Sequence, residues 1–334
     1  MLYRYIVRLW QQKNIINYLL IPASIIFFIL SYLRVLLYKI KGVHINNKFV
    51  ICIGNATVGG GGKTPTCISL AKKLSINGLK VVVLTKGYKG KIVNPTLFLV
   101  NEAKDPEQTG DEAILINRTT PVVVSKNWVL GLKFIEKLDF DIVITDDGYQ
   151  NTSFLKNFNL LVVDAEYGFG NGFILPSGPL RQFVGISLNK ADGVLFIRYG
   201  LKLNNIYEKT KHQHQVFQAN IEYSYSETLK NKKLLAFCGL ANPNKFYQSL
   251  LDNQLIVADF IAYKDHYKYS NEDVLNLIDK AEKQNHILIT THKDLVKISK
   301  IYHNKIHTLS IEIKIPEPLL EQINLSYKAF LDKK

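Results

Sequence analysis

Four consecutive glycines followed by lysine and threonine form the most informative run of the sequence, "GNATVGGGGKTP" at residues 54–65. Backbone N–H groups in such a loop can converge on an anion, especially where a helix begins. Lys63 can then reach the terminal phosphates of a nucleotide, and the Thr64 hydroxyl can bind Mg²⁺. The usual spacing has a glycine where this chain has Thr57, so the loop has a variant first position. We predict a nucleotide-binding phosphate loop made of Gly59, Gly60, Gly61, Gly62, Lys63, Thr64 and Pro65.

Two adjacent acids form the second chemical signal, in "DIVITDDGYQ". The apolar residues before them are typical of a buried strand, and Asp146 and Asp147 follow at its carboxyl end. In a phosphate-loop fold, a carboxylate at that position can hold Mg²⁺ directly or through water. We therefore predict that Asp146 is a metal ligand beside Thr64. Tyr149, in the same run, is expected to be a packing residue.

Three further runs place polar residues at the ends of expected elements. "TGDEAILI" puts Asp111 and Glu112 at the start of a helix, where acids are favoured for ordinary capping reasons. "YKDHYKYS" puts His266 after a strand, and a single histidine is more often structural than catalytic. "LPSGPLRQ" is expected to be a rigid loop whose Arg181 opens a helix and can grip a phosphate. Taken singly, these runs do not define a site.

The elements that must position these residues alternate along the chain from residue 49. Short apolar segments such as "FVICIG" and "KVVVLT" are typical of buried strands, and stretches such as "NWVLGLKFIEKL" have helical periodicity. This alternation predicts an α/β fold like that of the P-loop NTPases, a parallel sheet with helices on both faces, over residues 39–215. After "ADGVLFIRY" the rhythm changes, and "HQVFQANIEYSYS" is expected to be an extended connecting strand. We predict a second, smaller α/β domain over residues 216–334.

The N-terminus contains 20 uncharged residues between Lys13 and Arg34, "NIINYLLIPASIIFFILSYL". As one helix they would extend about 30 Å, roughly the hydrocarbon thickness of a bilayer, and Pro22 is expected to kink that helix. We predict a membrane-anchoring helix in residues 1–38, which either spans the bilayer or lies in its interface; a buried core helix is the alternative. The basic residues on its two sides are nearly balanced and give no orientation: Arg4, Arg8 and Lys13 precede it, and Arg34, Lys39 and Lys41 follow it.

Composition limits the remaining possibilities. Lys and Arg outnumber Asp and Glu by 42 to 28, and the resulting formal charge of +14 favours an anionic partner. The sequence has no basic, aromatic-interleaved nucleic-acid module of the usual kinds, so we expect no nucleic-acid partner. Cys52, Cys67 and Cys238 are far apart and form no CxxC pair, which argues against a disulfide framework or a zinc site.

In combination and in this order, the runs resemble the tetraacyldisaccharide 4′-kinase family, the lipid A 4′-kinases. The resemblance rests on an apolar N-terminal helix followed by "GNATVGGGGKTP", "TKGYKGK", "GDE", "DDGYQ", "LPSGPLRQ", "DHYKYS" and "TTHKD", and covers nearly the whole chain. It implies transfer of the γ-phosphate of ATP to the 4′-hydroxyl of a tetraacyldisaccharide 1-phosphate, which makes lipid IVA in lipid A biosynthesis. The implied cofactors are ATP and Mg²⁺. The implied partners are the acylated disaccharide phosphate lipid and the inner membrane, at whose cytoplasmic face the anchored enzyme would work.

The resemblance also implies roles for individual residues. Lys63 and Thr64 match the residues that bind ATP and Mg²⁺, and the phosphate loop of the family also tends to lack its first glycine. Asp111 matches the acid that takes the acceptor proton, and His266 matches the histidine that supports it. Asp147, with Asp146, matches the paired acids near the metal, so the implied catalytic residues are Asp111, His266 and Asp147. Because Asp111 and His266 lie in different predicted domains, we expect domain closure to bring them together.

The chain departs from the family pattern at three positions. Lys86 stands where arginine is common, which keeps the charge but loses a bidentate grip on phosphate. Gln182 stands where a glutamate often follows the arginine, and His292 replaces a common acid. The residues also leave open a membrane-anchored P-loop ATPase or nucleotide switch that has no lipid acceptor.

Overall fold

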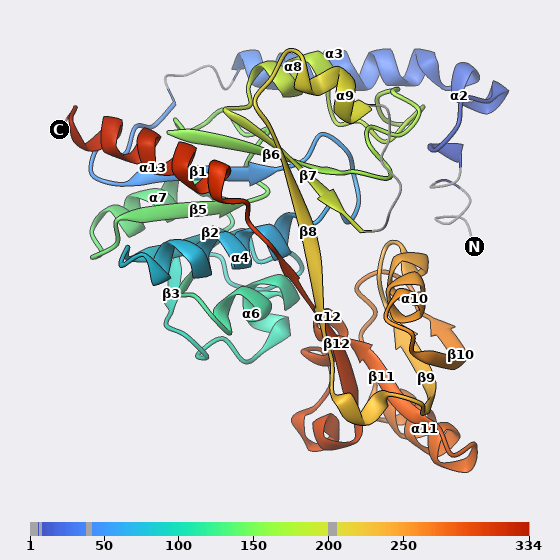
Figure 1. The fold of residues 1–334 in the computed structure, drawn as a ribbon. Coiled ribbons are helices and arrows are strands. Elements are labelled where there is room, and N and C mark those ends of the chain that lie inside the picture. Colours follow the sequence, from blue (N-terminus) through green and yellow to red (C-terminus); the bar gives the residue numbers. More distant parts are fainter. Residues whose placement is uncertain (1–5, 7–8, 38–41, 200–205, 334) are drawn as a thin grey trace.

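The computed structural model describes residues 6, 9–37, 42–199 and 206–333, which build one sheet of 12 strands with helices around it (Figure 1). The strands are β1 (Phe49–Gly54), β2 (Val81–Thr85), β3 (Thr96–Phe98), β4 (Val122–Val124), β5 (Ile142–Asp146), β6 (Phe158–Asp164), β7 (Gly193–Arg198), β8 (Val216–Ser224), β9 (Lys233–Cys238), β10 (Ile256–Ala262), β11 (Ile287–Thr291) and β12 (His307–Ile313). The helices are α2 (Ile15–Leu19), α3 (Ile21–Leu37), α4 (Lys63–Ile76), α5 (Pro106–Thr109), α6 (Asp111–Asn117), α7 (Trp128–Glu136), α8 (Val184–Asn189), α9 (Ile206–Lys211), α10 (Pro243–Asp252), α11 (Asn271–Lys283), α12 (His292–Leu295) and α13 (Glu317–Leu331), with 3₁₀ turns η1 (Glu227–Leu229) and η2 (Lys300–Lys305).

The sheet is predominantly parallel. Its strand order is β10-β9-β11-β12-β8-β7-β6-β1-β5-β2-β4-β3, and within the described residues the antiparallel pairs are β8 with β12 and β3 with β4. Parallel pairing puts the carboxyl ends of β1 and β5 side by side, with Ile53 opposite Asp146. The residues that follow these two strands therefore meet at one edge of the sheet, as the sequence predicted for an α/β fold.

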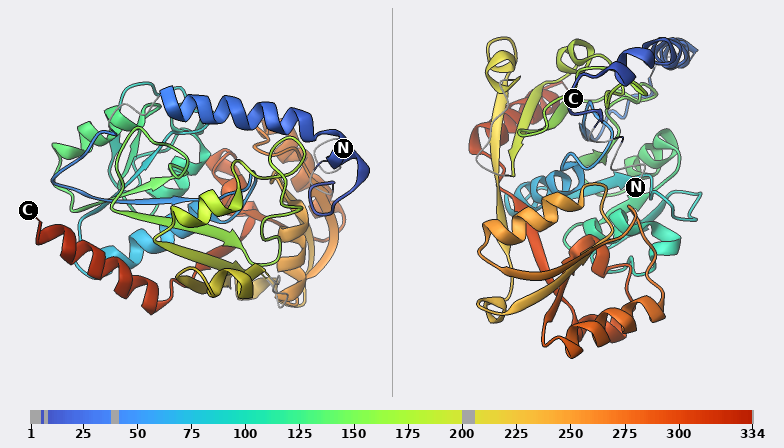
Figure 2. Two further views of the ribbon diagram at one scale, coloured as in Figure 1. Left: turned by 90° about the horizontal axis from the view of Figure 1, so that it is seen from above. Right: turned by 90° about the vertical axis from the view of Figure 1, so that its right-hand side faces the viewer.

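Helices cover both faces of the N-terminal strands because those strands are apolar on both sides. Ile51 and Ile53 face the core cluster that includes α4 and α13, whereas Cys52 faces the cluster that includes α3 and α8. Figure 2 shows α3 and α13 on opposite sides of the sheet. The predicted parallel sheet with two helical layers is confirmed.

The long strands β8 and β12 connect the two parts of the sheet. Val216–Asn220 of β8 pairs with β7, and Ile221–Ser224 pairs with β12, so β8 is the extended connecting strand that the sequence predicts. Beyond it, β9 packs one face on α11 and the other on α10. The second set of strands and helices is thus present within one continuous sheet. The domain boundaries at 38/39 and 215/216 stay predictions, and the first lies outside the described residues.

The N-terminal segment differs from the single helix that the sequence predicts. The described residues contain no helix of sufficient length and apolarity to cross a bilayer. The segment is broken at Leu20 into α2 and the 17-residue α3, and Pro22 lies in the first turn of α3, where its missing N–H costs nothing. The flanking Arg4, Arg8, Lys39 and Lys41 lie outside the described residues, as does the side chain of Arg34.

Polar contacts with a loop explain the break. Asn17 is buried, and its Nδ2 donates to the carbonyl of Ser177 at 2.7 Å. Ser24 is also buried, and its Oγ donates to the carbonyl of Ile174 at 2.9 Å. Both helices therefore have a protein-facing side, which a helix surrounded by lipid would not need. Whether the segment spans the bilayer or lies in its interface stays a prediction.

Candidate active site

The glycine-rich run forms a loop between β1 and α4, as the sequence predicts. Gly59 and Gly60 are exposed, whereas Gly62 is buried with a φ of 84°. A Cβ at Gly62 would lie 2.6 Å from Cδ1 of Ile197 and 2.9 Å from Oη of Tyr199, so glycine is needed there for both conformation and space. Gly62 caps α4 without a side chain, which leaves the first N–H groups of a 14-residue helix available to an anion.

Backbone pairing explains how the loop accommodates Thr57 in place of glycine. Thr57 forms an isolated antiparallel bridge with Leu180. On either side of it, Val58 N–H donates to the Pro179 carbonyl at 2.8 Å and Arg181 N–H donates to the Ala56 carbonyl at 2.8 Å. Thr57 is therefore extended and needs no glycine. Arg181 itself lies in a bend after this pairing, so the prediction that Arg181 opens a helix is wrong: α8 begins at Val184.

Lys63 and Arg181 converge on Asp147. The Lys63 Nζ lies 3.7 Å from Oδ1 of Asp147 and donates to Oδ1 of Asn55 at 3.1 Å. Arg181 donates to the same Asp147 oxygen at 2.9 Å. Gln150 completes the group, because its Nε2 donates to the Asn55 carbonyl at 2.6 Å. Neither Asn55 nor Gln150 was predicted as a site residue, and only their closeness in sequence to the loop and to the paired acids could have indicated them.

Asp146 has the features of a metal ligand. It ends β5, and its Oδ2 accepts a 2.9 Å hydrogen bond from the Thr64 hydroxyl. Its Oδ1 is buried and has no hydrogen-bond partner among the described residues. Burial, then the charges of Glu112 and Asp147, raise the pKa of Asp146 to about 7. A buried carboxylate oxygen without a partner, beside a hydroxyl, fits a hard cation such as Mg²⁺.

The surroundings of Asp146 agree with Mg²⁺ bound together with a nucleotide. In the described part of the chain, no cluster of three or more His, Cys, Asp or Glu side chains is arranged to hold a metal by itself. Mg²⁺ commonly takes only one or two protein ligands and completes its shell with water and substrate phosphates. Thr64 and Asp146 are the residues that would hold it.

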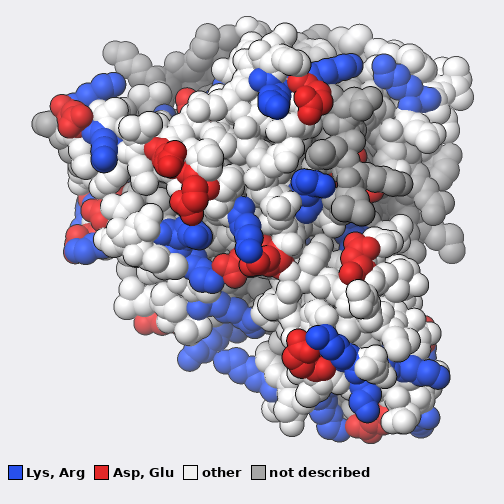
Figure 3. Space-filling view, viewed as in Figure 1, with Lys and Arg blue, Asp and Glu red and all other residues white. Residues whose placement is uncertain are grey.

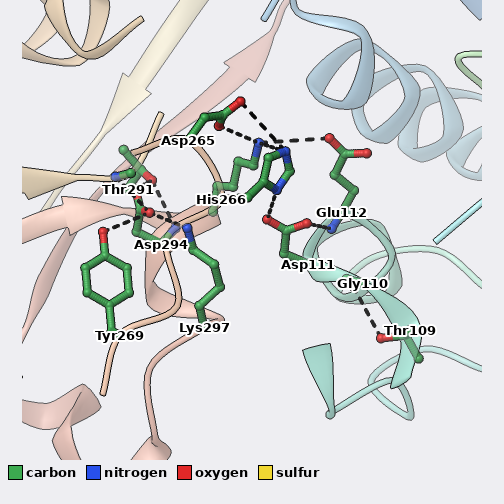
Figure 4. Close-up of polar contacts among 12 residues, drawn as sticks. Thr109, Gly110, Asp111, Glu112, Asp265, His266, Tyr269, Thr291, Asp294 and Lys297 are labelled. Carbon is green, nitrogen blue, oxygen red and sulfur yellow. Dashed lines mark hydrogen bonds and ion pairs between the residues drawn. The ribbon is translucent and has the colours of Figure 1, made fainter. Parts of the chain in front are cut away.

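Asp111 and His266 meet across the two parts of the sheet (Figure 4). Nδ1 of His266 lies 2.8 Å from Oδ2 of Asp111, and their side chains are only 12% and 6% exposed. Asp111 begins α6 as predicted, and His266 follows β10 with a φ of 56°. The two side chains are already in contact in this structure, which corrects the expectation that domain closure must bring them together.

Charges near the dyad keep Asp111 ionised. Burial raises the pKa of Asp111, but the hydrogen bond from His266 and the charge of Lys293 outweigh burial, so its pKa is lowered overall. Glu112 has the opposite balance, because burial raises its pKa more than Lys293 lowers it. Lys293, in the run "TTHKD", was not predicted as a site residue. Its Nζ lies 3.3 Å from Nε2 of His266.

One cleft of about 1720 Å³ connects these groups. Its lining includes Gly59–Thr64, Asp146, Asp147, Glu112, His266 and Lys293, and Phe27, Phe28 and Tyr32 of α3. Asp111 is not in the wall itself, because it lies behind Glu112 and His266. Pro65, the last residue predicted for the phosphate loop, lines the same cleft.

The departures from the family pattern have structural explanations in part. Lys86 lies over the ring of Trp128, with Nζ 5.6 Å from the ring centroid. Nε2 of Gln182 donates to Oγ of Ser187 at 2.9 Å, so it supports the start of α8. Nε2 of His292 is 3.1 Å from Oγ of Ser310, and burial, aided by Arg118, lowers the pKa of His292 to about 4. His292 is therefore neutral and ties α12 to β12. Tyr149 is buried and donates to the Ser187 carbonyl at 2.7 Å, which confirms its packing role.

We expect Asp146→Asn to stabilise the protein without added nucleotide while abolishing Mg²⁺-dependent ATP binding. The folded pKa of about 7 exceeds the value of about 4 in an unfolded chain. The unfolded carboxyl therefore ionises first, and wild-type stability falls as pH rises from about 4 to about 7. In urea unfolding, the free energy of unfolding of Asp146→Asn should equal that of the wild type at about pH 4. It should exceed the wild-type value most above about pH 7. Asp139→Asn, which replaces an 86% exposed acid, is the control. The burial argument would be contradicted if the free energy of unfolding of Asp146→Asn showed no gain over the wild type as pH rises.

Comparison with known proteins agrees with this geometry. The profile of the tetraacyldisaccharide-1-P 4′-kinase family matches residues 16–328. Tetraacyldisaccharide 4′-kinases of Rickettsia canadensis and Rickettsia felis are 37% and 36% identical, each match covering 96% of this chain and 97% and 96% of the relative. The fold is similar to a crystal structure of LpxK from Aquifex aeolicus in complex with ATP, with a TM-score of 0.73 and 24% identity over 94% of this chain and 100% of that one. From its sequence, this chain belongs to the tetraacyldisaccharide-1-P 4′-kinase family.

Proposed function

We propose that this protein transfers the γ-phosphate of ATP to the 4′-hydroxyl of a tetraacyldisaccharide 1-phosphate, and so makes lipid IVA in lipid A biosynthesis. The observation that carries the proposal is the single cleft lined by both the phosphate loop and His266. A nucleotide switch needs the first of these and has no use for the second. Family membership supplies the identity of the acceptor.

The donor side of the cleft provides positioning and charge neutralisation, which are the main requirements of phosphoryl transfer. The N–H groups at the start of α4 bind phosphate oxygens, and Lys63 neutralises their charge. Thr64 and Asp146 would hold Mg²⁺, which would supply further neutralisation of phosphate charge. Asp147 holds Lys63 and Arg181 near each other, so both cations are placed for the phosphates before ATP arrives.

The acceptor side supplies the base. The oxygen of the 4′-hydroxyl forms a bond to the γ-phosphorus, the bond between that phosphorus and the β–γ bridging oxygen breaks, and ADP leaves. Asp111 takes the hydroxyl proton, while His266 orients the carboxylate through its 2.8 Å contact. Since Glu112 and His266 cover Asp111, we infer that the bound acceptor parts these side chains to reach the carboxylate.

The N-terminal helices are suited to the membrane interface. The sides of α2 and α3 that face away from the protein expose Ile15, Ile16, Leu19, Ile25, Ile26, Ile29, Leu30 and Leu33. A helix with one apolar side against lipid and one side against protein lies along a membrane surface. We infer that α2 and α3 anchor the enzyme at the cytoplasmic face of the inner membrane without crossing it. Phe27 and Phe28, on the protein side of α3, then lead from the bilayer into the cleft.

Incubation with ATP and the acyl-disaccharide phosphate tests the proposed reaction. Mass analysis of the lipid should show one added phosphate, and Lys63→Ala should lower that product at least roughly 100-fold because phosphate charge is no longer neutralised. Circular dichroism of the variant checks that it folds. Release of free phosphate with no phosphorylated lipid would favour the ATPase or nucleotide-switch alternative.

A double-mutant cycle tests the dyad. Asp111→Ala and His266→Ala should each lower kcat with much less effect on ATP affinity. The double variant should lose less than the product of the single losses, since residues that act as a unit are non-additive. Multiplicative losses would show that the two residues serve separate steps. Normal turnover by His266→Ala would leave that histidine with a structural role alone.

Charge on the exposed side of α3 tests the anchor. Ile26→Glu combined with Leu30→Glu should weaken binding to anionic phospholipid vesicles at least roughly tenfold, because each apolar side chain of this size contributes about 1.5–3 kcal/mol when buried. Ile301→Glu is the matched control: Ile301 is 71% exposed, and lies in η2 rather than in α3. Equal vesicle binding by all three proteins would place the anchor elsewhere.

A further inference from the structure

The imidazole of His266 has two different neighbours on its two nitrogens. Nδ1 is 2.8 Å from Oδ2 of Asp111, and Nε2 is 3.3 Å from Nζ of Lys293. An ammonium group has hydrogens to donate and no lone pair to accept. Nε2 must therefore offer its lone pair to Lys293, and the one proton of a neutral imidazole then sits on Nδ1, where it is donated to Asp111.

Several carboxylates around the ring favour the opposite state, a doubly protonated imidazolium. Asp111 and Glu112 approach from α6, and Asp265 lies in the same loop as His266, as Figure 4 shows. The Asp265 Oδ2 is 3.9 Å from Nε2, which is too long for a hydrogen bond but close enough to attract a proton there. The ring of Tyr88 covers the histidine at a centroid distance of 5.2 Å and adds no charge at neutral pH.

Lys293 is the cation placed to oppose these acids. Its Nζ is 3.7 Å from Oδ1 of Asp265 and 4.0 Å from Oε1 of Glu112, and its side chain is 23% exposed. It belongs to α12, and the next residue, Asp294, is fully buried and accepts hydrogen bonds from Gly239 N–H at 3.0 Å and the Tyr269 hydroxyl at 3.1 Å. Gly239 in turn accepts from the His266 N–H at 3.2 Å. The helix that carries Lys293 is therefore fixed to the loop that carries His266.

We propose that Lys293 is a positioning residue that holds His266 neutral, with its single proton on Nδ1 and the lone pair of Nε2 occupied. Asp111 then receives one neutral hydrogen bond and is not locked in a buried ion pair with an imidazolium. The carboxylate remains a usable acceptor for the hydroxyl proton. The catalytic consequence rests on the proposed function, whereas the protonation pattern of His266 does not.

Nitrogen NMR of protein labelled with ¹⁵N-histidine tests the pattern directly. The spectrum of His266→Gln identifies the His266 signals among those of the 8 histidines. In the wild type at neutral pH we expect a protonated Nδ1 and an unprotonated Nε2. Lys293→Met should give the doubly protonated signature at the same pH, and Lys293→Arg should restore the wild-type pattern. Lys280→Met, which removes an ion-paired lysine on α11, is the charge-matched control and should change nothing.

Kinetics supply the second readout. The acid limb of the kcat–pH profile should move up by about one pH unit or more in Lys293→Met, because a nearby cation no longer opposes protonation of the ring. A wild-type His266 protonated on Nε2 at neutral pH, or a Lys293→Met protein with an unchanged spectrum, would overturn the proposal. If the spectra behave as expected but no lipid is phosphorylated, the assignment of Lys293 stands and the proposed reaction fails.

Discussion

The contact between Asp111 and His266 is the interaction on which the arrangement of the site depends. The two residues are 155 positions apart and come from different parts of the sheet. Their contact depends on tertiary structure and not on closeness in sequence. The paired strands β8 and β12 set the direction of the C-terminal strands. An apolar cluster of Ala103, Ile114 and Val296 packs α6 against the residue that follows α12.

A second polar contact joins the same two parts on the other side of the cleft. Lys245 of α10 pairs with the carboxylate of Asp164 at the end of β6, and its Nζ lies 3.7 Å from the centroid of the Tyr199 ring. Polar contacts on two sides of the cleft therefore accompany the apolar cluster in joining the two parts.

The acidic side chains of the cleft are balanced by cations close to them. Asp146 is buried and Glu112 is partly buried, burial raises the pKa of both acids, and each lies near Lys63 or Lys293. Burying acids close together is unfavourable unless cations balance them. Bound Mg²⁺ would add its positive charge to that of the lysines in the cleft. On the outer face seen in Figure 3, Lys and Arg side chains are interspersed with Asp and Glu.

The sequence predicts the parts of this site that local pattern determines. The phosphate loop and the acids of β5 are contiguous runs beside apolar strands, so spacing alone locates them, and parallel pairing of β1 with β5 follows from the alternation of strands and helices. Asp111 and His266 were identified only through resemblance, because no local rule connects residues so distant in sequence. Lys293 was missed, since a lysine at the start of a helix has no distinctive local signal.

The N-terminal segment shows the same limit in a different form. Its composition correctly indicates apolar helix, but composition cannot distinguish a helix that crosses a bilayer from two helices that lie against a protein. The distinction depends on Asn17 and Ser24, whose polar side chains find partners in the loop at residues 171–177. These partners are more than 140 residues away in sequence, so hydropathy averaged along the segment cannot register them.

Under the membrane attachment proposed above, the same geometry links anchoring to catalysis. One helix, α3, exposes Ile25, Ile26 and Ile29 on its outer side and contributes Phe27 and Phe28 to the cleft wall, with Phe28 packed on Phe183 at a centroid distance of 4.8 Å. A lipid whose acyl chains stay in the bilayer can present its headgroup only a short distance above the membrane surface. An enzyme that must reach such a headgroup gains from a surface helix that forms part of the cleft itself, because the depth of the helix in the membrane then sets the height of the dyad and the phosphate loop. A spanning helix on a flexible linker would hold the enzyme near the membrane without fixing that height.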